Sequence, residues 1–184
     1  MRCECDSHAD TVVAGSNMKF LDVLDNNTPT VDVEPFAATY DKMKNIPIGT
    51  CATAYDCPDT GKTFLLLFGQ ALYFGDKVNT TLLCPNQMRA AGNVVEDTPC
   101  QYDDKSSHSI TFIDQDDDEL RLNIPMNLDG VISNFITRLP TDEEIKDETL
   151  NYFWATSEEE WNPYDTRFSE RERAHCIPTA RGSC

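Results

Sequence analysis

The spacing of short apolar and β-branched runs constrains this chain more than any other feature, because the runs recur roughly every ten residues with turn residues between them. They are residues 11–13, 20–24, 31–33, 46–55, 62–68, 82–84, 110–113, 119–124 and 130–136. Runs this short and this regularly separated predict strands rather than helices. The predicted fold class is mainly β, either a barrel or a sandwich.

Two pairs of these runs predict β-hairpins. The first hairpin joins residues 20–24 to residues 31–33 across a loose turn at residues 25–29. The second joins residues 46–55 to residues 62–68, and Pro58 and Gly61 between them are typical of a type I turn.

One helix and a tail complete the predicted organisation. Residues 85–92 predict a two-turn helix, with Pro85 at its first position and Gly92 just past its end. Residues 1–140 form the predicted domain. Residues 141–184 predict an acidic tail or interdomain linker, since they hold 11 acids and 5 bases in 44 positions. A capping signature beginning at Thr141 predicts one short helix there, ending near Asn151.

The charge and the apolar stretches exclude two classes of partner. A formal charge of −17 disfavours nucleic-acid binding by this segment, because the protein would repel phosphate backbones. The longest apolar stretch, residues 64–75, is shorter than the roughly 20 residues of a membrane-spanning helix. Residues 1–15 lack the pattern of a secretory signal. We therefore expect a cytoplasmic protein without a membrane partner.

Eight cysteines leave two alternatives, a disulfide framework or free thiols. The absence of a secretory signal and of a repeated cysteine spacing favours free thiols. Cys3, Cys5 and His8 lie close enough in the sequence for a zinc site, but such sites usually combine two clusters and no second one matches. We expect no metal and no other cofactor.

Residues 6–10 read Asp-Ser-His-Ala-Asp and precede the apolar run at residues 11–13. An aspartic protease needs a carboxylate that projects from a tight loop and shares a proton with a second carboxylate. A hydroxyl beside it, here that of Ser7, can anchor the loop, and the apolar strand fixes the loop to the core. The alternative is an Asp-rich surface turn without chemistry, and these five residues alone do not separate the two.

Three segments in order carry a more specific likeness. They are DSHADTVVAGSN at residues 6–17, IPIGTCATAYDCPDTGKTFLLL at 46–67 and LYFGDKVNTTLLCPNQMRAAGNVVED at 72–97. Together they resemble the retropepsin-like aspartic protease region of copia-type retrotransposon Gag-Pol polyproteins, in the branch from algal and fungal genomes that carries DSHAD. The resemblance covers about residues 5–130. It implies a closed β-barrel with a flap hairpin and one short helix in its C-terminal half.

The resemblance also implies a function and a site. The protein would be an aspartic endopeptidase that processes its own polyprotein, acts as a homodimer, and works in the cytoplasm, in virus-like particles or in the nucleus. Asp6 from each of two copies would activate a water molecule, and Ser7 would brace the two loops. The implied substrate-binding residues are His8, Ala9 and Asp10 in the loop, and Pro58, Asp59, Thr60 and Gly61 at the flap tip.

This sequence departs from the family at two places. His8 stands where retropepsins have Gly, at a point where backbone atoms approach closely. Either the loop accommodates His8 and the site is competent, or the domain is a catalytically inactive assembly or binding module. Cys84 and Pro85 stand where retroviral members have Gly-Arg, so the ion pair of that Arg with the Asp10 position is absent.

Overall fold

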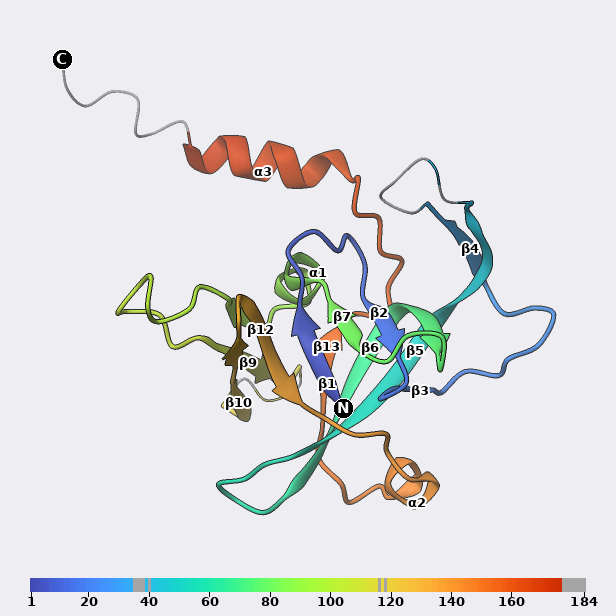
Figure 1. The fold of residues 1–184 in the computed structure, drawn as a ribbon, viewed down its shortest axis with the longest axis horizontal. Helices are drawn as coiled ribbons and strands as arrows, with labels where there is room; N and C mark the ends of the chain where they lie inside the picture. Colours follow the sequence, from blue (N-terminus) through green and yellow to red (C-terminus); the bar gives the residue numbers. More distant parts are fainter. Residues whose placement is uncertain (35–38, 40, 116, 118, 177–184) are drawn as a thin grey trace.

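The computed structural model describes residues 1–34, 39, 41–115, 117 and 119–176, and within them the chain is mainly β (Figure 1). Eight strands follow one another across the main sheet: β11 (Asn127–Asp129), β12 (Ile132–Ile136), β1 (Arg2–Cys5), β7 (Thr81–Leu83), β2 (Val13–Gly15), β6 (Thr63–Gly75), β5 (Met43–Asp56) and β3 (Lys19–Phe20). Two further strands join this sheet, β13 (Tyr152–Thr156) beside β6 and β4 (Thr30–Val33) beside β5. A second sheet contains β10 (Arg121–Pro125), β9 (Ser109–Ile113) and β8 (Val94–Glu96).

The main sheet is open in the part of the chain that the structure describes. Its hydrogen-bonded path ends at β11 on one side and at β3 on the other, and no pairing among the described strands joins these edges. The closed barrel predicted from the sequence is therefore not found. The strands at these two edges have three and two residues, and short edge strands are a common way for an open sheet to end.

The predicted hairpin of residues 46–55 and 62–68 is confirmed as β5 and β6, which pair antiparallel down to Asp56 and Thr63. On its other edge β6 changes partner, from β13 in its first half to β2 in its second half. The change falls at Gly69 and Gln70. Gln70 has a positive φ of 53°, and a Cβ at Gly69 would collide with the backbone carbonyl of Ser157. This bend allows one edge of β6 to pair with β13 along its first half and with β2 along its second half.

The other predicted hairpin, of residues 20–24 with 31–33, is wrong. β3 and β4 do not pair with each other, because both pair antiparallel with β5. β5 has 14 residues, so one of its edges accommodates both short strands in turn. After Phe20 the chain leaves the sheet, and the side chains of Leu21, Val23 and Leu24 are exposed.

Other predicted elements are confirmed. The helix expected at residues 85–92 is α1 (Pro85–Ala90), which Cys84 caps and which Gly92, with a φ of 91°, follows. The runs at 110–113, 119–124 and 130–136 form β9, β10 and β12.

Of the described helices, none combines the length and the apolar character needed to cross a membrane.

The segment after residue 140 differs from the predicted acidic tail. It begins with α2 (Asp142–Lys146), which starts at the predicted capping box of Thr141 and Glu144 but is shorter than expected. β13 then enters the main sheet and buries Phe153 and Ala155, so the folded domain extends past residue 140. α3 (Thr166–Cys176) follows on the outside of the molecule, with none of its residues buried (Figure 1).

A single buried apolar cluster draws on both sheets. Among its largest members, Phe68 and Phe135 come from the main sheet and Phe112 comes from β9 of the second sheet. Phe153 of β13 belongs to the same cluster. The second sheet and β13 are therefore parts of one domain rather than separate units.

Arg138 connects the turn end of the long hairpin to α2. Its guanidinium donates hydrogen bonds to Asp56 at 2.7 and 3.0 Å and to Glu144 at 2.8 and 2.6 Å. Such paired, charge-assisted bonds favour the ionised carboxylate. The hydrogen bonds from Arg138 are the main reason that the pKa of Glu144 is lowered from its usual 4.5 to about 2.

We expect Glu144→Gln to lower the free energy of unfolding at pH 7 by about 0.5–1 kcal/mol, because Gln keeps the helix cap but loses the ionic bonds to Arg138. A lowered pKa means that this contribution is complete above pH 4.5 and disappears as the pH falls towards 2. Urea unfolding between pH 7 and pH 2.5 measures it, with Glu143→Gln on the same helix as the control. A difference from wild type that is the same at every pH would contradict the assignment.

Candidate active site

The loop of residues 6–10 connects the end of β1 to the segment leading into β2. β1 runs parallel to β7, and the N–H of Asp6 donates to the carbonyl of Leu83 at 3.0 Å, which extends this pairing into the loop. The N–H of Ala9 then donates to the carbonyl of Asp6 at 3.2 Å and closes a tight turn. Asp6 thus lies on a short turn at the end of two parallel strands, and Figure 1 shows the loop that joins β1 to β2.

The backbone accommodates His8, which stands where the proteins that the sequence resembles have Gly. His8 is not among the described non-glycine residues with positive φ, which are Asn45, Gln70 and His108. Its side chain is 96% exposed, and its N–H donates to Oδ1 of Asp6 at 2.9 Å. Its ring nitrogen Nδ1 lies 4.0 Å from the same oxygen. A side chain at this position therefore requires no left-handed backbone and points into solvent.

Asp10, at the other end of the loop, is bound by the C-terminal part of the chain. Its carboxylate Oδ2 accepts a hydrogen bond from the hydroxyl of Tyr164 at 3.0 Å, and its backbone carbonyl accepts one from Nε1 of Trp161 at 2.8 Å. The hydrogen bond to Asp10 raises the pKa of Tyr164, and the negative charge of Glu34 contributes in the same direction. Glu34 follows β4, so the end of β4 lies on the same side of the molecule as this loop.

A cleft of about 550 Å³ opens between the loop and the C-terminal segment. On one side it is lined by loop residues and by α1, and on the other by residues 161–172. The lining includes Ser7, His8, Ala9 and Asp10 of the loop, and Phe168 and Arg171 of α3. The cleft therefore places four of the predicted site residues beside parts of the chain that were not predicted to be near them.

Gln87 of α1 is a site residue that sequence reasoning missed. Its side chain is buried, and its Oε1 accepts a hydrogen bond from the N–H of Val12 at 2.9 Å. Its Nε2 donates to the carbonyls of Gly69 and Gln70 at 3.5 and 3.4 Å. The available signal was a polar residue on the face of α1 that also buries Pro85 and Met88. Gln87 ties the strand that leaves the Asp6 loop to the bend of β6.

The structure does not bring the predicted flap tip to the Asp6 loop. Residues 58–61 form the turn of the β5–β6 hairpin, and Figure 1 shows this turn at the opposite end of the molecule from the loop. The reason is that β5 and β6 stay paired along the whole sheet and carry the turn past its far edge, where Asp56 meets Arg138. Pro58, Asp59, Thr60 and Gly61 are therefore separated from Asp6, Ser7, His8, Ala9 and Asp10.

The residues weighed for a zinc site are also kept apart. Cys3 is buried with its Sγ 3.4 Å from Oγ1 of Thr137, whereas His8 faces solvent. Burial raises the pKa of Cys3 to about 11 and that of Cys5 to about 12, which disfavours the thiolates that a metal requires. Within the described residues no three His, Cys, Asp or Glu side chains gather as a metal site. The cysteines from Cys3 to Cys100 are free thiols.

Comparisons of this chain with family models, with curated proteins and with solved structures found no match.

We expect Gln87→Met to destabilise the protein by about 1–3 kcal/mol, because an apolar side chain of similar length leaves the buried N–H of Val12 without an acceptor. Urea unfolding measures the change, and Asn86→Ala, at the exposed neighbouring position of α1, is the control. An equal, small effect of both variants would show that the Gln87 amide does not hold the loop.

Proposed function

We propose that this protein is an aspartic endopeptidase of the retropepsin type, in which Asp6 from each of two copies activates a water molecule. The observation that carries the proposal is the way in which the Asp6 loop is held by the strands and the helix around it. The loop extends the parallel pairing of β1 with β7, and α1 lies behind it through the Gln87–Val12 hydrogen bond. The resemblance of residues 6–17, 46–67 and 72–97 to that family supports the same conclusion.

The proposed chemistry needs no metal. Two Asp6 carboxylates a few Å apart cannot both ionise, so they hold one proton between them. The ionised carboxylate takes a proton from water as the water oxygen bonds to the peptide carbon, and the protonated one gives its proton to the carbonyl oxygen. Collapse of the tetrahedral intermediate breaks the C–N bond: the leaving nitrogen takes the proton that the first carboxylate accepted from water, and a hydroxyl of the intermediate returns a proton to the second carboxylate. The pair again holds one proton, and the two peptide products leave.

A second copy is required because one chain supplies a single Asp-Ser-x-Ala segment. The carboxylate of Asp6 is 37% exposed, so it is not buried in the core of one copy, and a partner related by two-fold symmetry could supply the second carboxylate. Each copy carries a formal charge of −17, so association is favoured by salt and by a pH closer to the isoelectric point.

The turn at residues 58–61, which the resemblance implies as the flap tip, is not part of the proposed site, because it lies at the opposite end of the molecule from the Asp6 loop (Figure 1).

A second candidate function is a catalytically inactive module that binds or assembles. The observation in its favour is that both hydrogen-bond acceptors of Asp10 already have partners. Tyr164 donates to its carboxylate and Trp161 to its backbone carbonyl, both from the same chain. A peptide that needed these acceptors would have to displace Tyr164 and Trp161.

We expect Asp6→Asn to abolish peptide cleavage while leaving the fold intact, because Asn has the same shape but cannot share the proton. The assay incubates the protein with a mixture of peptides of defined sequence at pH 5 and reads new termini by mass spectrometry. Asp59→Asn, in the distant β5–β6 turn, is the matched control and should cleave as wild type does. Cleavage by Asp6→Asn at more than a few per cent of the wild-type rate would exclude the proposed chemistry.

A further inference from the structure

We infer that residues 157–176, called the strap from here on, cover the surface through which a second copy of this chain reaches Asp6. The inference rests on the proposed function, since it takes a site shared by two copies as its premise. The strap and the second copy bind the same surface, so each excludes the other. Release of the strap therefore controls assembly of the site.

The path of the strap out of the sheet is fixed at the bend of β6. The hydroxyl of Thr156 donates to the carbonyl of Gly69 at 2.7 Å, and Nε2 of Gln70 donates to the carbonyl of Glu158 at 3.3 Å. A side chain at Gly69 would collide with the backbone of Ser157. These contacts direct the chain from the end of β13 across β6 and towards the Asp6 loop.

The strap is anchored at Asp10. Trp161 donates to the backbone carbonyl of Asp10 at 2.8 Å, and Tyr164 donates to its carboxylate at 3.0 Å. The ring of Trp161 also packs against the ring of Phe168, with centroids 5.5 Å apart, and so joins this anchor to α3. Asp10 is one of the substrate-binding residues that the family resemblance implies. The strap therefore uses the acceptors that a bound peptide would use.

α3 lies across the approach to the loop. The cleft of about 550 Å³ has Ser7, His8 and Ala9 on one wall and residues 168, 171 and 172 of α3 on the other. Two carboxylates that share a proton must come within about 3 Å of each other, which brings the two loops into contact. A cleft of this size holds a few side chains but not the loop and helix of another copy.

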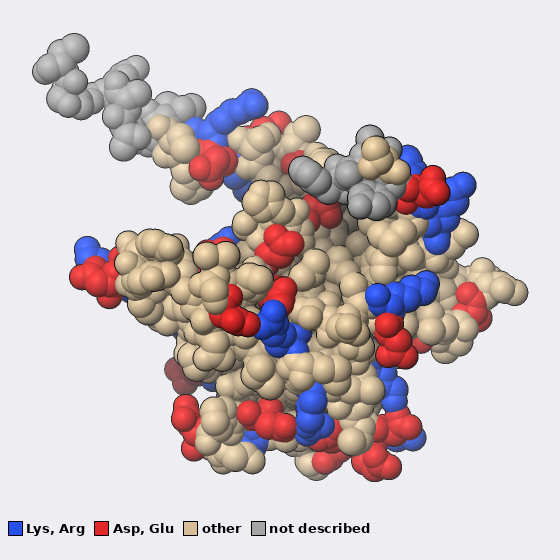
Figure 2. All heavy atoms as spheres, in the orientation of Figure 1, with Lys and Arg blue, Asp and Glu red and all other residues tan. Residues whose placement is uncertain are grey.

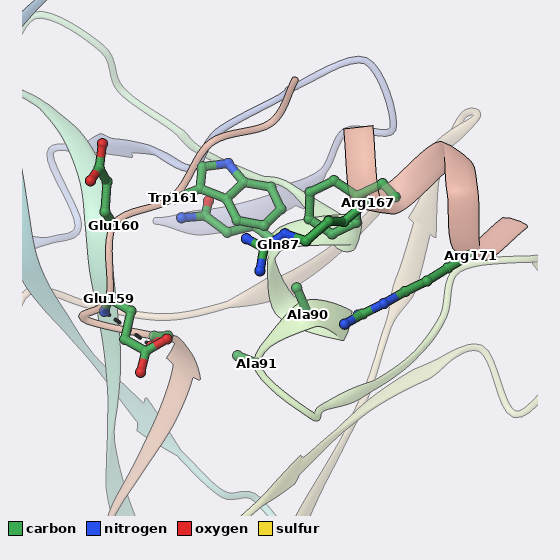
Figure 3. Close-up of a pocket in the computed structure, with 10 residues that line it drawn as sticks. Gln87, Ala90, Ala91, Glu159, Glu160, Trp161, Arg167 and Arg171 are labelled. Carbon is green, nitrogen blue, oxygen red and sulfur yellow. Dashed lines mark hydrogen bonds between the residues drawn. The ribbon is translucent and has the colours of Figure 1, made fainter. Parts of the chain in front are cut away.

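The views of the molecule agree with this arrangement. Figure 1 shows α3 above the loop that joins β1 to β2, and Figure 2 shows an open notch between α3 and the body of the molecule. Figure 3 shows Trp161 beside Gln87, and the side chain of Arg171 reaching from α3 towards Ala90 of α1. The strap thus contacts the helix behind the loop as well as the loop itself.

The strap is held weakly enough to be displaced. None of the residues of α3 is buried, and Tyr164 is exposed. Hydrogen bonds at an exposed site compete with water and contribute little net stability. An interface between two copies would bury much more surface than these anchors. The strap therefore raises the concentration at which copies associate, and does not prevent association.

The test compares two double variants of the full chain. Trp161→Phe with Tyr164→Phe removes both hydrogen bonds to Asp10 and keeps the aromatic rings, so the fold is retained. Trp154→Phe with Tyr102→Phe makes the same chemical changes outside the strap and is the control. Sedimentation equilibrium at pH 5 and at physiological salt gives the dimer dissociation constant. We expect the strap variant to dimerise about tenfold more tightly than the wild type and the control.

Two further measurements assign the effect to the strap and to the loop. Tyr164→Phe alone should speed hydrogen exchange of the Trp161 indole N–H, with the Trp154 indole unchanged. His8→Glu, added to the strap variant, should remove the gain in dimerisation, because it places a negative charge at a 96% exposed position of the loop, on the surface where the copies would meet.

The outcomes separate the inference from the proposed function. Tighter dimerisation with faster peptide cleavage supports both. Tighter dimerisation that His8→Glu reverses, without cleavage by any variant, supports the inference and contradicts the proposed function. Unchanged dimerisation despite faster indole exchange overturns the inference. Slower cleavage by the strap variant also overturns it, since the strap would then be part of the peptide-binding cleft, while the proposed function would stand.

Discussion

The buried amide of Gln87 is the interaction on which the rest of the structure depends. Its oxygen accepts a hydrogen bond from the N–H of Val12, just after the Asp6 loop. Its nitrogen donates hydrogen bonds to the carbonyls of Gly69 and Gln70 at the bend of β6. One side chain thereby fixes the strand that leaves the loop and the helix behind the loop. It also fixes the point at which β6 stops pairing with β13 and begins to pair with β2. Because the strap begins at the same bend, the loop and its cover are positioned by the same contacts.

Strong contacts hold the Asp6 loop within one copy, whereas the contacts that hold the strap are weak. The Asp6 loop is held by backbone pairing and by a buried amide, and it is therefore preorganised before any partner arrives. In the proposed dimer, association would work against the repulsion of two charges of −17 and against the docked strap. The proposal therefore places the geometry of the loop within each copy, and it makes the fraction of assembled sites depend on pH, salt and the strap.

The sequence predicted most where local chemistry decides the structure. The helix at residues 85–92 and the start of α2 follow from capping residues, and the long hairpin follows from one turn between two apolar runs. Long-range pairing was not predictable in the same way. β4 pairs with β5, and β13 pairs with β6. Both pairings depend on which strand edges remain open in the folded sheet. The position of the turn at residues 58–61 depends on the length of β5, and the contact of Trp161 with Asp10 joins residues that are far apart in the sequence.

The most direct test of the central claim mixes two forms of the protein. Wild type and Asp6→Asn are combined in varying ratio at constant total concentration, in the range where dimers predominate, and peptide cleavage is measured. If each site needs Asp6 from both copies, activity falls with the square of the wild-type fraction, to about one quarter in an equal mixture. Activity that falls in direct proportion to the wild-type fraction would show that a single copy carries a complete site, and would contradict the account.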